Sequence, residues 1–136
     1  MRAALLLPGL LVLAASACER QPPAGAEQGV VDELAFEGER ACADCDAIAT
    51  RLVLRRRDDR RDYALTETYR AQSGDLRFVE RGRWQRQQAL LRLQGEGGSR
   101  RTYAVLPDGR LQARDPRGAI LPGAHDVLVP VADAGR

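Results

Sequence analysis

The chain has 136 residues, 21 basic and 19 acidic side chains for a formal net charge of +2, and 4% aromatic residues. This length suits one domain with a core of its own. The near balance of charge gives no support to nucleic-acid binding, and two aspartates interrupt the arginine run 55–61, which we therefore expect to be a solvated loop.

Residues 1–17 have the pattern of a cleaved lipoprotein signal peptide. Arg2 supplies a basic start, and residues 3–15 are uncharged, leucine-rich and too short to span a bilayer as a helix. Small residues at 14–17 then precede Cys18, as in a bacterial lipobox, where the cysteine is acylated and becomes the new N-terminus. We expect lipidation of Cys18. The alternative is an ordinary signal peptide cut after Ala17, which leaves the Cys18 thiol free.

Residues 18–33 predict a flexible tether between the lipid and the domain. Pro22 and Pro23 lie in this segment, which carries no apolar periodicity. We expect the folded domain to span residues 34–132.

From Leu34 onwards, alternation of apolar and polar residues predicts short strands. The segments with this pattern are 34–38, 48–55, 63–69, 76–81, 84–93, 102–106, a piece from Leu111 and 127–131. Turns are predicted at Gly82, at the glycine-rich segment 95–99, and at 107–109 and 115–118, where proline and glycine favour chain reversal. Pro130 suggests that the last strand is an edge.

No stretch predicts a convincing amphipathic helix. Seven or eight short strands with tight turns predict an all-β protein, either a small sandwich or, as the better fit, a small antiparallel up-and-down, lipocalin-like β-barrel. A barrel also leaves no exposed sheet edges.

Cys42 and Cys45 form the one motif that carries chemistry. Two nearby thiolates suit a soft metal such as Cu(I), whereas in an oxidising compartment the pair would form a disulfide. These two interpretations exclude each other at any moment, and both stay open. Thioredoxin-like redox chemistry is less favoured because no βαβ context surrounds the motif. His125 is a candidate metal ligand, although a surface histidine is the more favoured interpretation.

The residues around the cysteine pair resemble the N-terminal domain of the NlpE family, the copper-resistance and envelope-stress lipoproteins. The resemblance rests on Phe36-Glu37-Gly38, then Cys42-Ala43-Asp44-Cys45-Asp46-Ala47-Ile48, then Leu52-Val53-Leu54. The tyrosines at 63 and 69, the turn at 82–84 and the segment 111–120 extend it over nearly the whole domain. Asp46-Ala47 stands where the family has Pro-Gly.

The resemblance implies a small barrel anchored to the outer membrane on its periplasmic side. It also implies a role in copper tolerance, with copper as the possible metal, or in reporting envelope stress to a sensor kinase. Longer family members carry a second, OB-like domain, which we expect this chain to lack.

We therefore expect a non-catalytic envelope lipoprotein. No catalytic triad, carboxylate dyad or phosphate loop is recognisable in the sequence. Two alternatives remain: a lipocalin-like carrier of a small apolar ligand, which predicts an apolar cavity, and a periplasmic thiol-redox protein, which predicts a lowered pKa of Cys42.

Overall fold

The computed structural model describes residues 32–122 and 126–132, which form a closed antiparallel barrel in which each strand pairs with its neighbours in chain order. The predicted all-β up-and-down barrel is confirmed. The strands are β1 (Asp32–Arg40), β2 (Ala47–Arg57), β3 (Arg60–Arg70), β4 (Leu76–Gln87), β5 (Leu90–Gly95), β6 (Arg100–Val105), β7 (Leu111–Arg114) and β8 (Val127–Val131). Within these residues no helix is long and apolar enough to cross a membrane.

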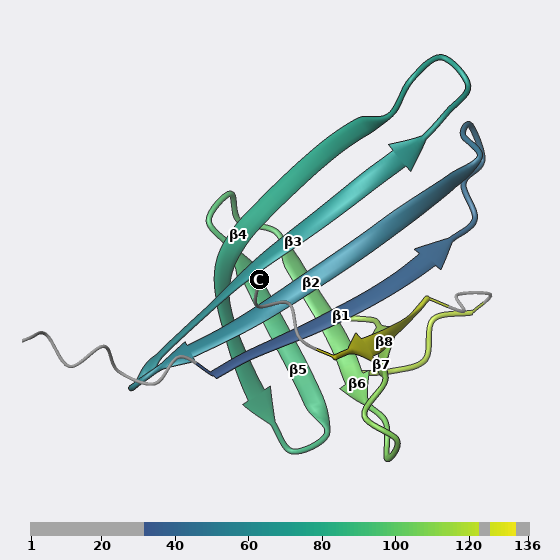
Figure 1. The fold of residues 1–136 in the computed structure, drawn as a ribbon. Coiled ribbons are helices and arrows are strands. Elements are labelled where there is room, and N and C mark those ends of the chain that lie inside the picture. The colour runs from purple at the N-terminus through teal and green to yellow at the C-terminus, as the bar shows by residue number, and fades with distance from the viewer. Residues whose placement is uncertain (1–31, 123–125, 133–136) are drawn as a thin grey trace, which may run out of the picture.

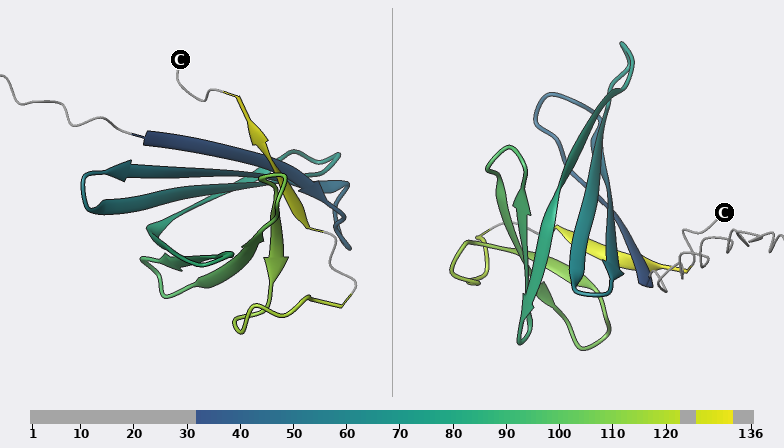
Figure 2. Two further views of the ribbon diagram at one scale, coloured as in Figure 1. Left: turned by 90° about the horizontal axis from the view of Figure 1, so that it is seen from below. Right: turned by 90° about the vertical axis from the view of Figure 1, so that its left-hand side faces the viewer.

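The barrel is uneven, because β1 to β4 have 9 to 12 residues and β5 to β8 have 4 to 6. The longer strands extend to the upper right of Figure 1, where the β3–β4 hairpin projects beyond the rest of the molecule (Figures 1 and 2). In this projecting part, β4 pairs with β3 from Leu76, but its pairing with β5 begins only at Gly82.

The core lies inside the barrel and follows the two-residue period of the strands. Ile48, Leu52 and Leu54 of β2 are buried, as the alternation predicts. The most deeply buried side chains come from four different strands: Leu52, Leu65, Leu93 and Leu111. Tyr63 and Tyr103 belong to the same buried cluster.

Gly82 does not end a strand, contrary to the sequence-based prediction, because β4 continues through it to Gln87. Gly82 lies opposite Gly95 of β5, and a Cβ atom at Gly82 would lie 2.0 Å from the carbonyl oxygen of Gln94. This glycine therefore permits a close approach of two backbones rather than a chain reversal.

The chain reverses instead within the segment 84–93, which was wrongly predicted to be one strand. Gln88 adopts a positive φ of 54° between β4 and β5. The arginine run is likewise not a loop: β2 reaches Arg57, β3 begins at Arg60, and Asp58, with φ 51°, makes the turn between them. Asp58-Asp59 and Gln88-Ala89 make these two turns without glycine or proline, so the sequence lacks the strongest turn signals there.

The barrel closes through β8, whose Leu128 is buried in the core. Pro130 pairs with Phe36 of β1, whereas β7 pairs only with Val127 and Leu128. Pro130 therefore lies in the part of β8 that is paired with β1 alone. Proline suits this position because it has no N–H to donate to a second neighbouring strand. At the other end, β1 begins at Asp32, two residues before the predicted start of the domain at Leu34.

Replacement of Leu52 by alanine should lower the free energy of unfolding by about 2–5 kcal/mol, because it leaves a cavity at a fully buried position. Leu34→Ala is the matched control, since Leu34 is 61% exposed. Urea unfolding followed by circular dichroism measures both. Equal effects of the two changes would contradict the assigned position of the core.

Candidate functional site

The cysteine motif forms the connection between β1 and β2. Cys42 and Cys45 are joined by a disulfide, with their Cα atoms 5.2 Å apart. Both cysteines are half-buried, whereas Asp44 and Asp46 beside them are exposed. The oxidised pair therefore closes a short loop at the end of the barrel that also holds the β3–β4 connection.

The cysteine loop is attached to its neighbours by the main chain. The N–H of Asp46 donates a hydrogen bond of 2.8 Å to the carbonyl oxygen of Arg70, the last residue of β3. The Sγ atom of Cys45 lies 3.6 Å from the carbonyl oxygen of Ala47. A disulfide sulfur carries no proton, so this second approach is a packing contact and not a hydrogen bond.

The donor atoms of this loop fit copper in only one redox state. A disulfide offers no thiolate, whereas the reduced pair would offer two soft donors of the kind that Cu(I) prefers. Within residues 32–122 and 126–132, no group of three or more histidine, cysteine, aspartate or glutamate side chains converges as a metal site. His125, the other candidate ligand, and Cys18 lie outside the described residues.

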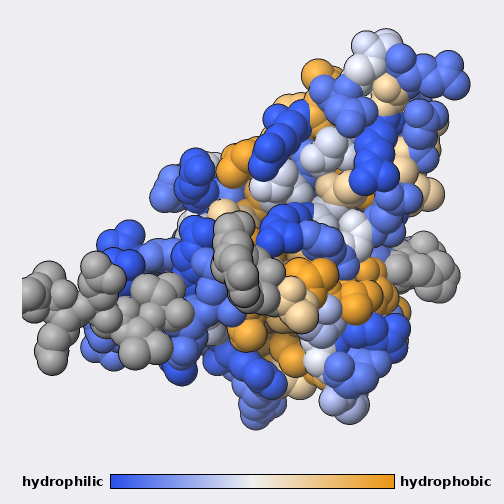
Figure 3. Space-filling model, in the orientation of Figure 1, coloured by the Kyte–Doolittle hydropathy of each residue, from blue (hydrophilic) through white to orange (hydrophobic). Residues whose placement is uncertain are grey.

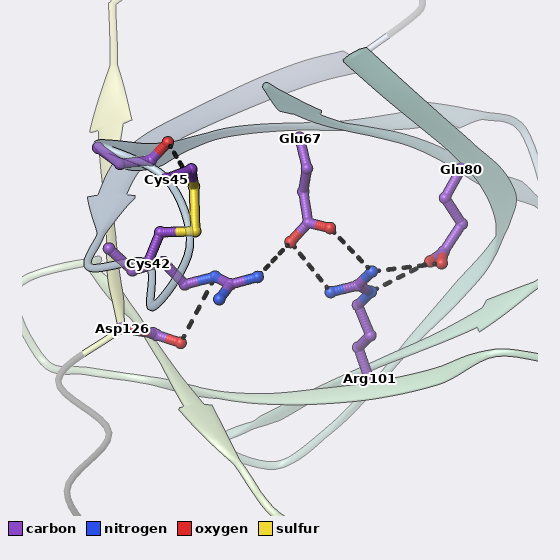
Figure 4. A network of polar contacts seen from close by, with 8 residues as sticks. Cys42, Cys45, Glu67, Glu80, Arg101 and Asp126 are labelled. Carbon is purple, nitrogen blue, oxygen red and sulfur yellow. Dashed lines mark hydrogen bonds and ion pairs between the residues drawn. A yellow bond between two sulfur atoms is a disulfide. The ribbon is translucent and has the colours of Figure 1, made fainter. Parts of the chain in front are cut away.

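A row of charged and polar side chains crosses the inside of the barrel next to this loop (Figure 4). In spatial order it contains Asp126, Arg40, Glu67, Arg101, Glu80 and Tyr63. These residues come from four strands, β1, β3, β4 and β6, and from the residue before β8, so the row connects parts of the sheet that are far apart in sequence.

Arg101 of β6 is the centre of the row. Its Nη1 atom lies 3.4 Å from Oε1 of Glu67, and its Nε atom lies 3.4 Å from Oε1 of Glu80. Glu67 also lies 3.3 Å from Nη2 of Arg40, whose Nε atom is 4.0 Å from Asp126. Because Arg40 ends β1 and lies two residues before Cys42, the row reaches the base of the cysteine loop.

The row shifts the pKa values of its members. Burial alone would raise the pKa of Glu80, but the hydrogen bond that Tyr63 donates at 2.7 Å and the charge of Arg101 outweigh it and hold that pKa below its usual range. Burial and the adjacent Glu80 carboxylate raise the pKa of Tyr63. Burial lowers the pKa of Arg101, but the charges of Glu67 and Glu80 reverse the effect and raise it. Glu80 and Arg101 are thus held in their charged forms.

Two hollows open beside these charges. One of about 410 Å³ lies between β4 and the β5–β6 turn, with Glu67, Glu80 and Arg101 in its lining. The other, of about 240 Å³, lies against Arg40 and Asp126. Charged linings of this kind suit polar groups better than an apolar ligand.

This row of charges was not predicted, although the sequence contains a signal for it. Glu67 lies two residues from Leu65 and Tyr69, and so falls on the inward face predicted for that strand. Arg101 lies two residues from Tyr103 in β6, so its side chain falls on the same inward face. Oppositely charged residues at inward positions of different strands are the pattern that predicts an internal ion-pair row.

Comparisons with known proteins identify a related family and a related fold. The model of the NlpE N-terminal domain family matches residues 36–124. The crystal structure of the Cpx pathway activator NlpE from Escherichia coli is similar with a TM-score of 0.57 and 24% sequence identity, over 75% of this chain and 52% of that chain. The chain thus spans about half the length of that protein, and the similarity shows a shared fold. No curated protein sequence matches the chain.

Replacement of Arg101 by methionine should lower the free energy of unfolding at pH 7 by about 1–3 kcal/mol, because Glu67 and Glu80 lose their shared cation. Glu80 has a lowered pKa in the folded state, so its contribution is present above about pH 4.5 and is lost as the pH falls through the folded value. The difference between wild type and variant should therefore shrink below that pH.

Urea unfolding at pH 7 and at pH 4 measures this difference. Arg100→Met serves as the control, since Arg100 is exposed and forms no ion pair within the described residues. A cost for Arg101→Met that does not change with pH would show that Arg101 stabilises the barrel by packing and not by its charge.

Proposed function

Because the chain belongs to the NlpE N-terminal domain family, we propose that it is a non-catalytic lipoprotein of the bacterial envelope that reports envelope stress. The observation that carries this proposal is the extent of the family match, which includes the cysteine loop and most of the barrel. The similar structure from Escherichia coli is that of a Cpx pathway activator, which supports an envelope sensor protein as the class of partner.

The proposed location follows from the first residues of the sequence. Lipidation of Cys18 would anchor the protein in the membrane, and more than one acyl chain makes such anchoring durable, since each buried methylene contributes about 0.8 kcal/mol. Glu19, rather than aspartate, follows the cysteine. We propose the periplasmic face of the outer membrane as the location.

A copper role belongs to the same proposal. The reduced pair Cys42 and Cys45 is the proposed Cu(I) site, and oxidation to the disulfide would remove both donors. Copper binding and disulfide formation would then compete for the same sulfur atoms, which makes the loop responsive to both copper and the redox state of the envelope.

The two alternative functions fit the structure less well. A carrier of apolar ligands needs an apolar cavity, whereas charged side chains line the hollows inside this barrel. A thioredoxin-like enzyme needs its cysteines at the start of a helix, whereas the described residues contain strands and turns only.

Expression of the full chain should activate a Cpx-pathway reporter in an Escherichia coli strain that lacks its own NlpE. Cys18→Ala should change the response, because the unlipidated protein would no longer be held at the membrane. Reporter output and membrane fractionation measure the two effects, and an unchanged fractionation of Cys18→Ala would contradict lipid anchoring. A chain that reaches the envelope at normal levels without altering the reporter would contradict the stress-reporting role.

A titration with Cu(I) tests the metal site. The reduced protein should bind one equivalent, whereas the oxidised protein and the Cys42→Ser/Cys45→Ser variant should bind far more weakly, because they lack the thiolate pair. Competition with a Cu(I)-specific chromophoric chelator measures the affinity. Equal binding by the reduced wild type and the double variant would assign any copper response to other residues.

A further inference from the structure

The first half of β4 is an open sheet edge. Leu76 to Arg81 pair with β3 on one side, and β5 pairs with β4 only from Gly82 onwards. The last contact on the second side is the hydrogen bond of 2.9 Å that the N–H of Glu96 donates to the carbonyl oxygen of Arg81. No other described strand lies beyond that bond.

The free hydrogen-bonding groups on this edge can be assigned. In an antiparallel strand, alternate residues direct their N–H and C=O groups to opposite sides. The carbonyl of Arg81 faces the β5 side, so the backbone groups of Val79 and Arg77 face that side too. They form a template on which an extended chain can be added as a further strand.

The side chains along this edge are unusually apolar for an exposed strand. Leu76, Phe78 and Val79 are 64%, 56% and 48% exposed. Figure 3 shows hydrophobic side chains along the upper edge of the projecting hairpin, over β4. An exposed apolar strand edge favours association, and proteins normally cover it or place charges on it. The hollow of about 410 Å³ beside Phe78 gives room for an added side chain.

Charge selects the kind of chain that fits. The positions of β4 to β7 that point outward carry six arginines and no carboxylate: Arg77, Arg81, Arg83, Arg92, Arg100 and Arg114. None of these arginines forms an ion pair within the described part of the chain. On the inward side, Glu80 disfavours an acidic residue opposite it, and Glu96 lies near Arg81 at the end of the edge.

We propose that the β4 edge from Leu76 to Glu80 binds an extended segment of another protein by strand addition. The segment carries a carboxylate opposite Arg77, apolar residues opposite Phe78 and Val79, and a neutral residue opposite Glu80. A second copy of this chain fits less well, because it would bring two arginine-rich faces together. The inference rests on the proposed function only in that the stress-sensing partner would supply the segment.

The probe is the peptide acetyl-Ser-Thr-Val-Leu-Asp-Ser-amide, which meets these requirements in antiparallel register, added to the full chain in detergent micelles. Binding should shift the backbone amide resonances of residues 76–81 and protect the N–H of Val79 from hydrogen exchange. Two control peptides separate the contributions. One carries lysine in place of aspartate, and the other is methylated on the valine and aspartate nitrogens that would face β4.

Three variants test the edge itself. Arg77→Glu should weaken binding by about tenfold or more, since it replaces a charge-assisted pair by repulsion. Arg83→Glu is its matched control, because Arg83 lies on the part of β4 that is already paired with β5. Val79→Pro removes one free N–H but no bond to β3, so it should abolish the peptide-induced protection of the Arg77 N–H while circular dichroism stays unchanged.

If the methylated peptide binds as well as the parent, the contact is not strand addition and the proposal fails. It also fails if no peptide binds, or if the protein instead forms a concentration-dependent dimer that Val79→Pro abolishes. The reporter experiment above is independent of these outcomes: activation by wild type and equally by Val79→Pro would leave the stress-reporting role standing and overturn the docking edge.

Discussion

The guanidinium group of Arg101 joins the two halves of this barrel where strand pairing does not. Between Leu76 and Glu80, β4 has no hydrogen-bonded neighbour on one side among the described residues. Arg101 of β6 reaches across this opening to Glu80 of β4 and Glu67 of β3. Because each of these contacts lies inside the barrel and away from most of the solvent, screening by salt is weaker than at an exposed pair. The ion pairs thus replace part of the missing sheet contact, and they leave the backbone edge of β4 open.

Much of this architecture follows from the two-residue period of the sequence. Leu52, Leu65 and Leu93 fall on inward positions that alternation alone identifies. The turns at Gly109 and Gly118, where φ is +85° and +87°, follow equally from local residue preferences. These features depend on near neighbours in the chain, and short-range patterns therefore predict them.

What escaped prediction depends on residues far apart in the chain. From the sequence, Gly82 looks like a turn residue. Only the pairing of β4 with β5 shows that it lies opposite Gly95. Alternation places Glu67 and Arg101 on inward positions, but their pairing at 3.4 Å follows only from the closure of the barrel. The disulfide was one of two open alternatives, because the spacing of Cys42 and Cys45 suits both a disulfide and a metal. The partners of Gly82, Gly95, Glu67 and Arg101 depend on the pairing register of strands that are far apart in the chain. The sequence of a single strand does not contain that register.

The outer surface divides into two regions of different charge. Glutamates of β1 pair with arginines of β2 and β3, as in the pairs Glu33–Arg55, Glu37–Arg51 and Glu39–Arg70. The outward face of β4 to β7 has no such partners within the described residues. Exposed pairs of this kind contribute about 0–1 kcal/mol each, so the first region gains little stability from them. Their main effect is to leave β4 to β7 as the cationic side of the barrel.

The cysteine loop and the open edge of β4 lie at the same end of the barrel. In the register of the sheet, Arg40 is opposite Ile48, Ile48 is opposite Tyr69, and Tyr69 is opposite Leu76. The hydrogen bond from Asp46 to Arg70 ties the loop to the end of β3, from which the chain continues into the start of β4. Reduction of the disulfide would change a loop that is hydrogen-bonded to the strand beside the proposed docking edge. The cysteine loop and the proposed docking edge thus meet at one end of the sheet, on strands that are hydrogen-bonded to each other.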